Sequence, residues 1–151
     1  MKRQDKYPET STFHYYNANP KNKMTADCNI RAISTALEIP YNQVVIEMAE
    51  MQCKTGYDVA SKQGIDKYLQ SKGWVKHSQP RKADNTKYTG QEFCKELTSD
   101  IMFVGKSVIA NIGGHHIVCI KETADLYGTH KVWDTWDSTD GCIGNYWVKG
   151  K

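Results

Sequence analysis

The sequence predicts an α+β fold in which a block of helices is followed by a block of strands. Between residues 27 and 97, apolar residues recur every three or four positions, as they do on one face of a helix. After residue 107, the apolar runs are short, rich in β-branched and aromatic residues, and separated by turns that contain Gly. This order of elements is typical of α+β domains rather than of alternating α/β domains.

Length and composition indicate one globular domain. The chain has 151 residues, of which 39% are hydrophobic and 25% charged, which suits a single core. Residues 1–11 are polar and charged, so we expect a flexible N-terminal arm followed by one domain over residues 12–151. The five cysteines are widely spaced and form no CxxC pair, which favours free thiols over a disulfide framework.

Charge and hydropathy limit the classes of partner. The net charge of +3 is mild and no nucleic-acid-binding motif accompanies the lysines, so a nucleic acid is not favoured as partner. No apolar run approaches the roughly 18 residues of a membrane span, and the N-terminus lacks the hydrophobic stretch of a secretory signal. We therefore expect a cytoplasmic protein that does not enter a membrane. Its oligomeric state is open.

Four helices are expected from the apolar periodicity. The first starts at Thr25 or Asp27 as N-cap, places Cys28 in its first turn and stops before Pro40. The second runs from residue 41 to about residue 54 and ends at Gly56, where a left-handed C-cap is favoured. The third and fourth cover residues 61–72 and 89–97, and a capping interaction at residue 89 starts the fourth.

Six extended runs are expected. The aromatic run 13–16 predicts a short strand before the helices, and run 74–77 predicts an extended segment between them. The remaining strands, which we expect to form an antiparallel sheet, cover residues 107–112, 116–120, 130–134 and 145–148.

Cys28 stands where the first helix is expected to begin. The first backbone N–H groups of a helix have no partner within it, so they stabilise an anion such as a thiolate. Cysteine is also a frequently buried residue, so position alone does not make it a nucleophile. Residues 113–118 and 132–137 add a histidine and a carboxylate, the base and orienting group that a thiol nucleophile needs.

The base and the carboxylate each have two candidates. His115 and His116 are adjacent, and neighbours in a strand point to opposite faces, so only one can face Cys28. Asp134 directly follows an apolar strand and is favoured as the orienting group. Asp137, the alternate, begins a turn-rich segment.

Other residues near these segments have structural interpretations. Arg31 is expected to pair with Asp27 or another acid, and Trp133 and Trp136 are candidates to shield the histidine and carboxylate from water. No second ligand pair with zinc-like spacing accompanies the histidines and Cys119, so no metal site is expected. The thiols outside these segments are treated as structural, namely Cys53, Cys94 and Cys142.

Four segments, YYNANP (15–20), DCNIRAI (27–33), HIVCI (116–120) and DTWDS (134–138), carry a resemblance that covers most of the chain. They resemble the papain-like cysteine peptidase superfamily, and in particular small members of the kind found in phage genomes. The resemblance implies a helical half, with Cys28 at the start of its central helix, packed on a C-terminal antiparallel sheet. A histidine followed by apolar strand residues matches the superfamily pattern, which favours His116 over His115.

The chain departs from the superfamily at the oxyanion donor. Larger members use a glutamine several residues before the cysteine, and here the nearest upstream amides are Asn19 and Asn22. Asn22 is the candidate for the side-chain oxyanion donor. The backbone N–H of Cys28 is expected to be a second donor. Loss of one such donor costs about 10²- to 10³-fold in rate in other acyl-transfer enzymes.

The expected function is a cysteine-dependent hydrolase, a peptidase or isopeptidase that acts on a protein or peptide through an acyl-enzyme. In this scheme Cys28 attacks, His116 transfers the proton and Asp134 orients His116, with no cofactor. One alternative is an acyltransferase of the transglutaminase type. The other is a non-catalytic protein-binding module, an effector or inhibitor on a degenerate peptidase scaffold, which the missing glutamine motivates.

Overall fold

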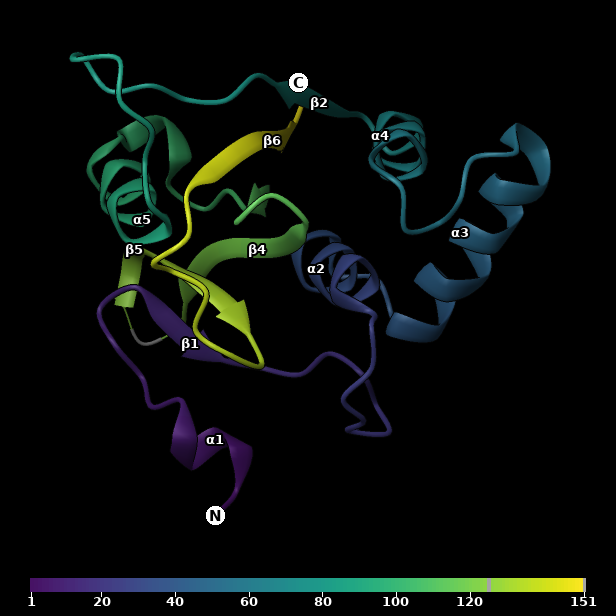
Figure 1. Cartoon of the computed structure of the whole chain (residues 1–151), viewed down its shortest axis with the longest axis horizontal. Helices are drawn as coiled ribbons and strands as arrows, with labels where there is room; N and C mark the ends of the chain where they lie inside the picture. The colour runs from purple at the N-terminus through teal and green to yellow at the C-terminus, as the bar shows by residue number, and fades with distance from the viewer. Residues whose placement is uncertain (125, 151) are drawn as a thin grey trace.

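The computed structural model describes residues 1–124 and 126–150 and confirms the α+β class. The helices are α1 (Arg3–Lys6), α2 (Cys28–Leu37), α3 (Tyr41–Thr55), α4 (Lys62–Ser71), α5 (Gly90–Ser99) and the 3-10 turn η1 (Ile101–Phe103). The strands are β1 (Phe13–Tyr15), β2 (Trp74–His77), β3 (Val108–Ile112), β4 (His116–Thr123), β5 (Leu126–Asp134) and β6 (Ile143–Lys149). Figure 1 shows their arrangement.

The helix boundaries follow from local signals in the sequence. Glu38 adopts the left-handed conformation (φ 57°) and ends α2 before Pro40, while Gly56 (φ 78°) ends α3. Thr89 and Glu92 form the reciprocal hydrogen bonds of a capping box at the start of α5. The four expected helices are therefore confirmed to within one or two residues.

The six strands form one mixed sheet in the order β1-β5-β4-β3-β6-β2. Every neighbouring pair is antiparallel except β1 and β5, which are parallel. The expectation of a wholly antiparallel sheet is therefore wrong at this edge. Short turns between consecutive strands allow only antiparallel pairing, whereas a long connection through several helices separates β1 from β5 and permits the parallel arrangement.

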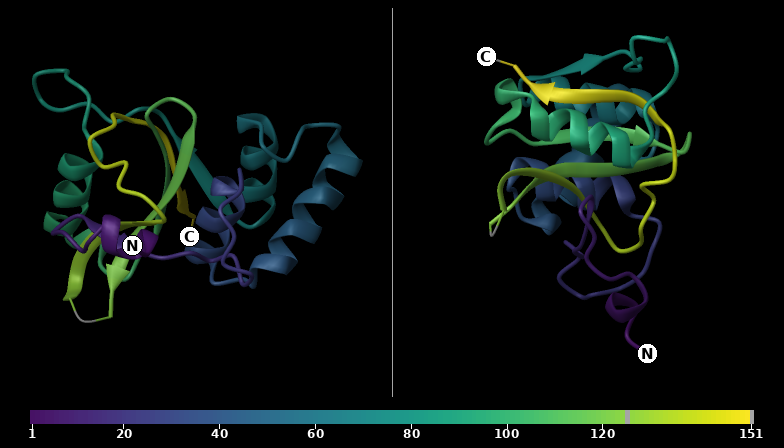
Figure 2. Two further views of the ribbon diagram at one scale, coloured as in Figure 1. Left: turned by 60° about the horizontal axis from the view of Figure 1, so that its bottom comes forward. Right: turned by 90° about the vertical axis from the view of Figure 1, so that its left-hand side faces the viewer.

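Helices cover both faces of the sheet. One core lies between the sheet and α2, α3 and α4, and includes Ile109, Ile117 and Cys119. The other lies under α5 and includes the alternate residues Ala110 and Val118. Figures 1 and 2 show α5 on the side of the sheet opposite α2, so the helices do not form one separate half.

The sheet topology brings three chain segments together at one end of the strands. Because β1 and β5 are parallel, their last residues lie at the same end of the sheet, and the antiparallel strand β4 begins at that end. Tyr15, the last residue of β1, pairs with Asp134, the last residue of β5, and His116 is the first residue of β4. From β1 the chain continues through residues 16–27 into α2, which packs mainly on β4.

The N-terminal arm, residues 1–11, contains the short helix α1 and makes polar contacts with the domain. Arg3 Nε donates to the carbonyl oxygen of Thr135 (2.8 Å), and Lys131 Nζ donates to Glu9 Oε2 (2.8 Å). The expected flexibility of this arm stays a prediction. None of the described helices combines the length and the apolar character needed to cross a bilayer.

Candidate functional site

Cys28 is the first residue of α2, and its thiol is half-buried. Asp27, rather than Thr25, occupies the N-cap position, but its side chain caps none of the N–H groups of the helix. The first helical hydrogen bond runs from the Arg31 N–H to the Asp27 carbonyl oxygen (3.0 Å). The N–H groups of Cys28 and Asn29 precede that bond, so they are available to a negative charge at the helix start.

His116 and Asp134 are joined by a short hydrogen bond. The Nε2 atom of His116 lies 2.5 Å from Oδ2 of Asp134, whose side chain is only 2% exposed. The other oxygen of Asp134 accepts a hydrogen bond from the Thr135 N–H (2.7 Å). Because Nε2 is committed to Asp134, Nδ1 is the ring nitrogen left to exchange a proton with Cys28.

Cys28 and His116 shift each other's pKa. Burial raises the pKa of the Cys28 thiol, but hydrogen bonding to His116 and to the backbone of Ile117 outweighs burial and lowers it from its ordinary value. Burial lowers the pKa of His116, while hydrogen bonds to Asp134 and Cys28 raise it to about 9. A lowered thiol pKa beside a raised imidazole pKa favours a thiolate–imidazolium pair.

The alternates for base and carboxylate lie elsewhere. His115 is exposed in the turn before β4. The Oδ1 atom of Asp137 accepts hydrogen bonds from the N–H (3.0 Å) and the hydroxyl (2.6 Å) of Thr139, which makes Asp137 part of a turn. The structure therefore brings Cys28, His116 and Asp134 together and leaves both alternates outside this group.

The oxyanion candidate Asn22 is not in the group either. It is exposed, with a left-handed backbone (φ 52°), and its Oδ1 accepts a hydrogen bond from Asn17 (3.2 Å). Asn19 lies closer to the site, because its amide donates to Asp27 Oδ2 (3.3 Å). Within residues 1–124 and 126–150, no hydrogen bond joins Asn22 to Cys28. The uncapped N–H groups of α2 are the donors that the structure does place at Cys28.

Arg31 ties the start of α2 to the end of β5. Its Nε donates to Asp27 Oδ1 (2.8 Å) and its Nη1 donates to Asp134 Oδ1 (2.6 Å). The Tyr41 hydroxyl donates to the other oxygen of Asp27 (2.5 Å). The expected salt bridge between Arg31 and Asp27 is confirmed. The sequence interpretation left a second acid unnamed, and the structure shows that it is Asp134. Arg31 lies one turn after Cys28 and therefore on the same side of the helix.

Of the two tryptophans expected to shield the site, only Trp136 contacts it. The rings of Trp136 and His116 lie 4.9 Å apart between centroids, so the indole covers the imidazole from the solvent side. Trp133 packs instead against His14, which belongs to β1, and against Tyr16, which directly follows β1. Alternation along β5 places Trp133 on the face opposite Asp134.

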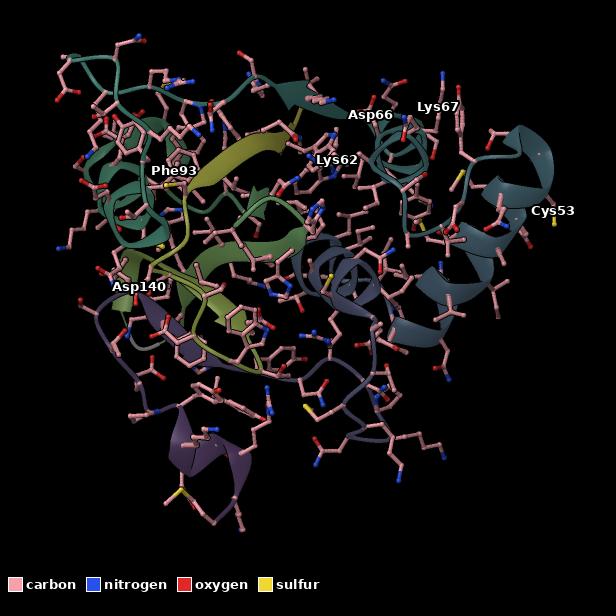
Figure 3. All side chains as sticks on the ribbon, in the orientation of Figure 1. Cys53, Lys62, Asp66, Lys67, Phe93 and Asp140 are labelled. Carbon is pink, nitrogen blue, oxygen red and sulfur yellow. The ribbon has the colours of Figure 1, made fainter. Side chains whose placement is uncertain are left out.

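The other four thiols differ from Cys28. Cys94 and Cys119 are buried in the two cores, and burial raises the pKa of each to about 12. Cys53 and Cys142 are exposed, so their interpretation as structural thiols is wrong with regard to packing. Figure 3 shows Cys53 on the outer side of α3, away from the sheet. In contrast to the two buried thiols, Cys28 has a lowered pKa.

No group of three His, Cys, Asp or Glu side chains converges as a metal site would require in the described part of the chain. His115 is exposed, while Cys119 is buried in the core under α2.

Comparison of the chain with protein-family models, with curated proteins and with solved structures finds no match. The functional argument therefore rests on the geometry of the site.

Proposed function

We propose that the protein is a cysteine-dependent hydrolase of the papain-like type, a peptidase or isopeptidase that acts on a protein or peptide. The observation that supports this most directly is the continuous connection from Cys28 through His116 to the buried Asp134. The shifts in pKa favour a thiolate at Cys28 and a protonated ring at His116, which are the states needed for attack and for protonation of the leaving group.

The reaction would proceed through an acyl-enzyme. The Cys28 thiolate attacks the carbonyl carbon, and the carbonyl oxygen becomes an oxyanion next to the free N–H groups at the start of α2. His116 donates its proton to the leaving amine as the C–N bond breaks. The ring then removes a proton from water, which attacks the thioester and releases the acid and the thiol. Asp134 stays ionised and stabilises the imidazolium.

The test is intact-mass detection of acyl-Cys28 together with release of an amine. Peptide amides, peptides joined through a lysine side chain, and peptides offered with a primary amine separate peptidase, isopeptidase and acyltransferase. We expect turnover by the wild-type protein and none by Cys28→Ala, while Cys53→Ala retains turnover as a matched control. An acyl adduct that persists in Cys28→Ala would refute the assignment.

A second candidate is a non-catalytic protein-binding module on the same scaffold. The observation that favours it is the position of Asn22, whose side chain contacts Asn17 rather than supplying an oxyanion donor. A reactive Cys28 that forms no acyl adduct with any of these substrates would support this candidate over the hydrolase.

A further inference from the structure

A cavity of about 380 Å³ lies between the start of α4 and the sheet. It is close to the start of α2, because the amide of Asn29, the residue after Cys28, donates to the carbonyl oxygen of Val59 (2.6 Å), the residue before Ala60 of the lining. On the sheet side, His115 and Ile117 line it, the two neighbours of His116 in the sequence. On the helix side, the lining comes from residues 60–65, which include Lys62. Figure 3 shows Lys62 between α4 and the strands. A substrate whose carbonyl lies at Cys28 therefore has this cavity within one or two residues of the bond under attack.

Asn111 closes the sheet side of the cavity. It belongs to β3, pairs with Ile117 of β4 and is 1% exposed. Within the described residues, neither its Nδ2 nor its Oδ1 has a hydrogen-bond partner. Buried amides are hydrogen-bonded in the great majority of proteins, so a side chain with both polar groups unpaired beside a cavity requires an explanation.

A β-bulge positions Asn111. Between β3 and β6 the register shifts so that Asn111 stands opposite both Gly144 and Asn145. Bulges redirect side chains and are common next to functional sites. The unpaired amide of Asn111 therefore lies at an irregular point of the β3–β6 pairing.

The chemistry of the lining indicates what the cavity receives. We propose that it is a substrate subsite that binds a side-chain carboxamide, as in Gln or Asn, close to the bond attacked by Cys28; this rests on the function proposed above. A carboxamide offers one acceptor to Nδ2 and one donor to Oδ1 of Asn111, and so satisfies both groups. A carboxylate satisfies only Nδ2, and an alkyl side chain satisfies neither.

The charge of the lining disfavours a cationic side chain, and the choice between a carboxamide and a carboxylate rests on the two unpaired groups of Asn111. Lys62 and His115 are the ionisable residues among the described residues that line the cavity, and no Asp or Glu lines it. A cationic side chain would therefore find no counter-charge there. The neutral carboxamide needs none.

Chloroacetyl peptides test the proposal without requiring turnover. The Cys28 thiolate displaces chloride, so a C–S bond forms as the C–Cl bond breaks, and the rate reports binding beside the thiol. Three sets of probes carry Gln, Glu or Leu at each of the first three positions next to the chloroacetyl group. At one position, we expect the Gln probe to alkylate Cys28 at least about tenfold faster than the Glu and Leu probes. Equal rates for Gln and Leu at all three positions would overturn the proposal.

Two variants change the lining of the cavity, one on the sheet side and one on the helix side. Asn111→Leu removes both polar groups, and Gln63→Trp fills the mouth from the exposed surface of α4, which keeps the test valid if the core variant does not fold. Each should bring the Gln-to-Leu rate ratio close to one. Asn42→Leu, on the exposed surface of α3, is the matched control and should keep the ratio. A ratio retained in both cavity variants would refute the subsite.

The failure of this proposal is distinguishable from failure of the proposed function. Methyl methanethiosulfonate, a small thiol reagent without a carboxamide, measures the intrinsic reactivity of Cys28. Equal Gln and Leu rates at a Cys28 that is far more reactive than Cys53 would overturn only the carboxamide subsite. A Cys28 no more reactive than Cys53 would overturn the hydrolase itself.

Discussion

Arg31 and Asp134 form a buried ion pair that links α2 to β5, with Nη1 2.6 Å from Oδ1. The second oxygen of the same carboxylate binds His116. Asp134, the proposed orienting group for His116, is thus held by a side chain from the helix that carries Cys28. The two halves of the candidate site are fixed to each other through Arg31.

Replacing Arg31 should destabilise the whole domain. Arg31→Met leaves Asp27 as a buried carboxylate without a cation and Asp134 with His116 as its remaining cationic partner, so we expect the free energy of unfolding to fall by about 3 kcal/mol. Arg31→Lys keeps the charge but not the forked geometry and should cost less. Urea unfolding measures both.

The control for Arg31 is a partly exposed ion pair. Lys72 Nζ lies 3.0 Å from Glu47 Oε1, and both side chains are partly exposed. Lys72→Met should therefore cost less than about 1 kcal/mol. If Arg31→Met cost no more than Lys72→Met, the account of Arg31 as the link between α2 and β5 would fail.

Asp134 and Asp137 should differ in their effect on turnover. Asp134→Asn removes the charge that raises the pKa of His116 to about 9, and we expect hydrolysis to fall by about 10²- to 10⁴-fold. Asp137→Asn changes only a turn and should alter kcat/KM by no more than a few fold. Equal losses in the two variants would contradict the assignment of Asp134.

The pH dependence of hydrolysis should be bell-shaped. The rate rises as the Cys28 thiol ionises, at a pH below the free-thiol value of about 8.5, because its pKa is lowered. The rate falls as pH passes about 9, where His116 loses the proton that it gives to the leaving group. His115→Ala should leave this profile in place. An upper limb near the ordinary histidine pKa of about 6.5 would contradict the coupling of His116 to Asp134 and Cys28.

Tyr41 should act on Cys28 through Asp27. Tyr41→Phe removes the hydroxyl that donates to Asp27 Oδ2 at 2.5 Å and leaves this oxygen with the longer hydrogen bond from Asn19 (3.3 Å), so we expect it to turn and cap the first turn of α2. A capping carboxylate occupies the N–H groups near the thiol and adds negative charge, so the pKa of Cys28 should rise and its alkylation at neutral pH should slow. Site-resolved alkylation rates measure the change.

Tyr68→Phe is the matched control for that experiment. The Tyr68 hydroxyl donates to Glu47 (2.7 Å), away from the start of α2, so its loss should leave the alkylation profile of Cys28 unchanged. A profile that does not move in Tyr41→Phe, or that moves equally in both variants, would show that Asp27 is not held away from the helix by Tyr41.

The helices could be predicted from the sequence because their signals are local. The spacing of apolar residues, the stop at Pro40, the glycine at residue 56 and the cap at residue 89 each act within a few positions. The expected strands were likewise present, because β-branched runs and turn residues define them locally. The parallel pairing of β1 with β5 could not be predicted, since it depends on contacts between residues far apart in sequence.

The candidate site, like the fold, has features that local sequence signals predict and features that depend on tertiary contacts. Cys28 could be placed at a helix start from its neighbours alone. Strand alternation shows only that one of His115 and His116 can face Cys28, and the preference for His116 came from the resemblance to the superfamily pattern. The pairing of Arg31 with Asp134 and the redirection of Asn111 could not be foreseen, because each depends on tertiary geometry. A buried arginine and an unpaired buried amide have no signature in sequence spacing.

The central claim is that Cys28 is a thiolate activated by His116, and the most direct test is the alkylation of all five thiols by iodoacetamide as a function of pH, resolved by peptide mass spectrometry. We expect Cys28 to react fastest, with an apparent pKa below about 8.5, and expect His116→Ala to raise that pKa while His115→Ala does not. Equal labelling of Cys28 and the exposed Cys53 and Cys142, or a rate for Cys28 that His116→Ala leaves unchanged, would contradict the account.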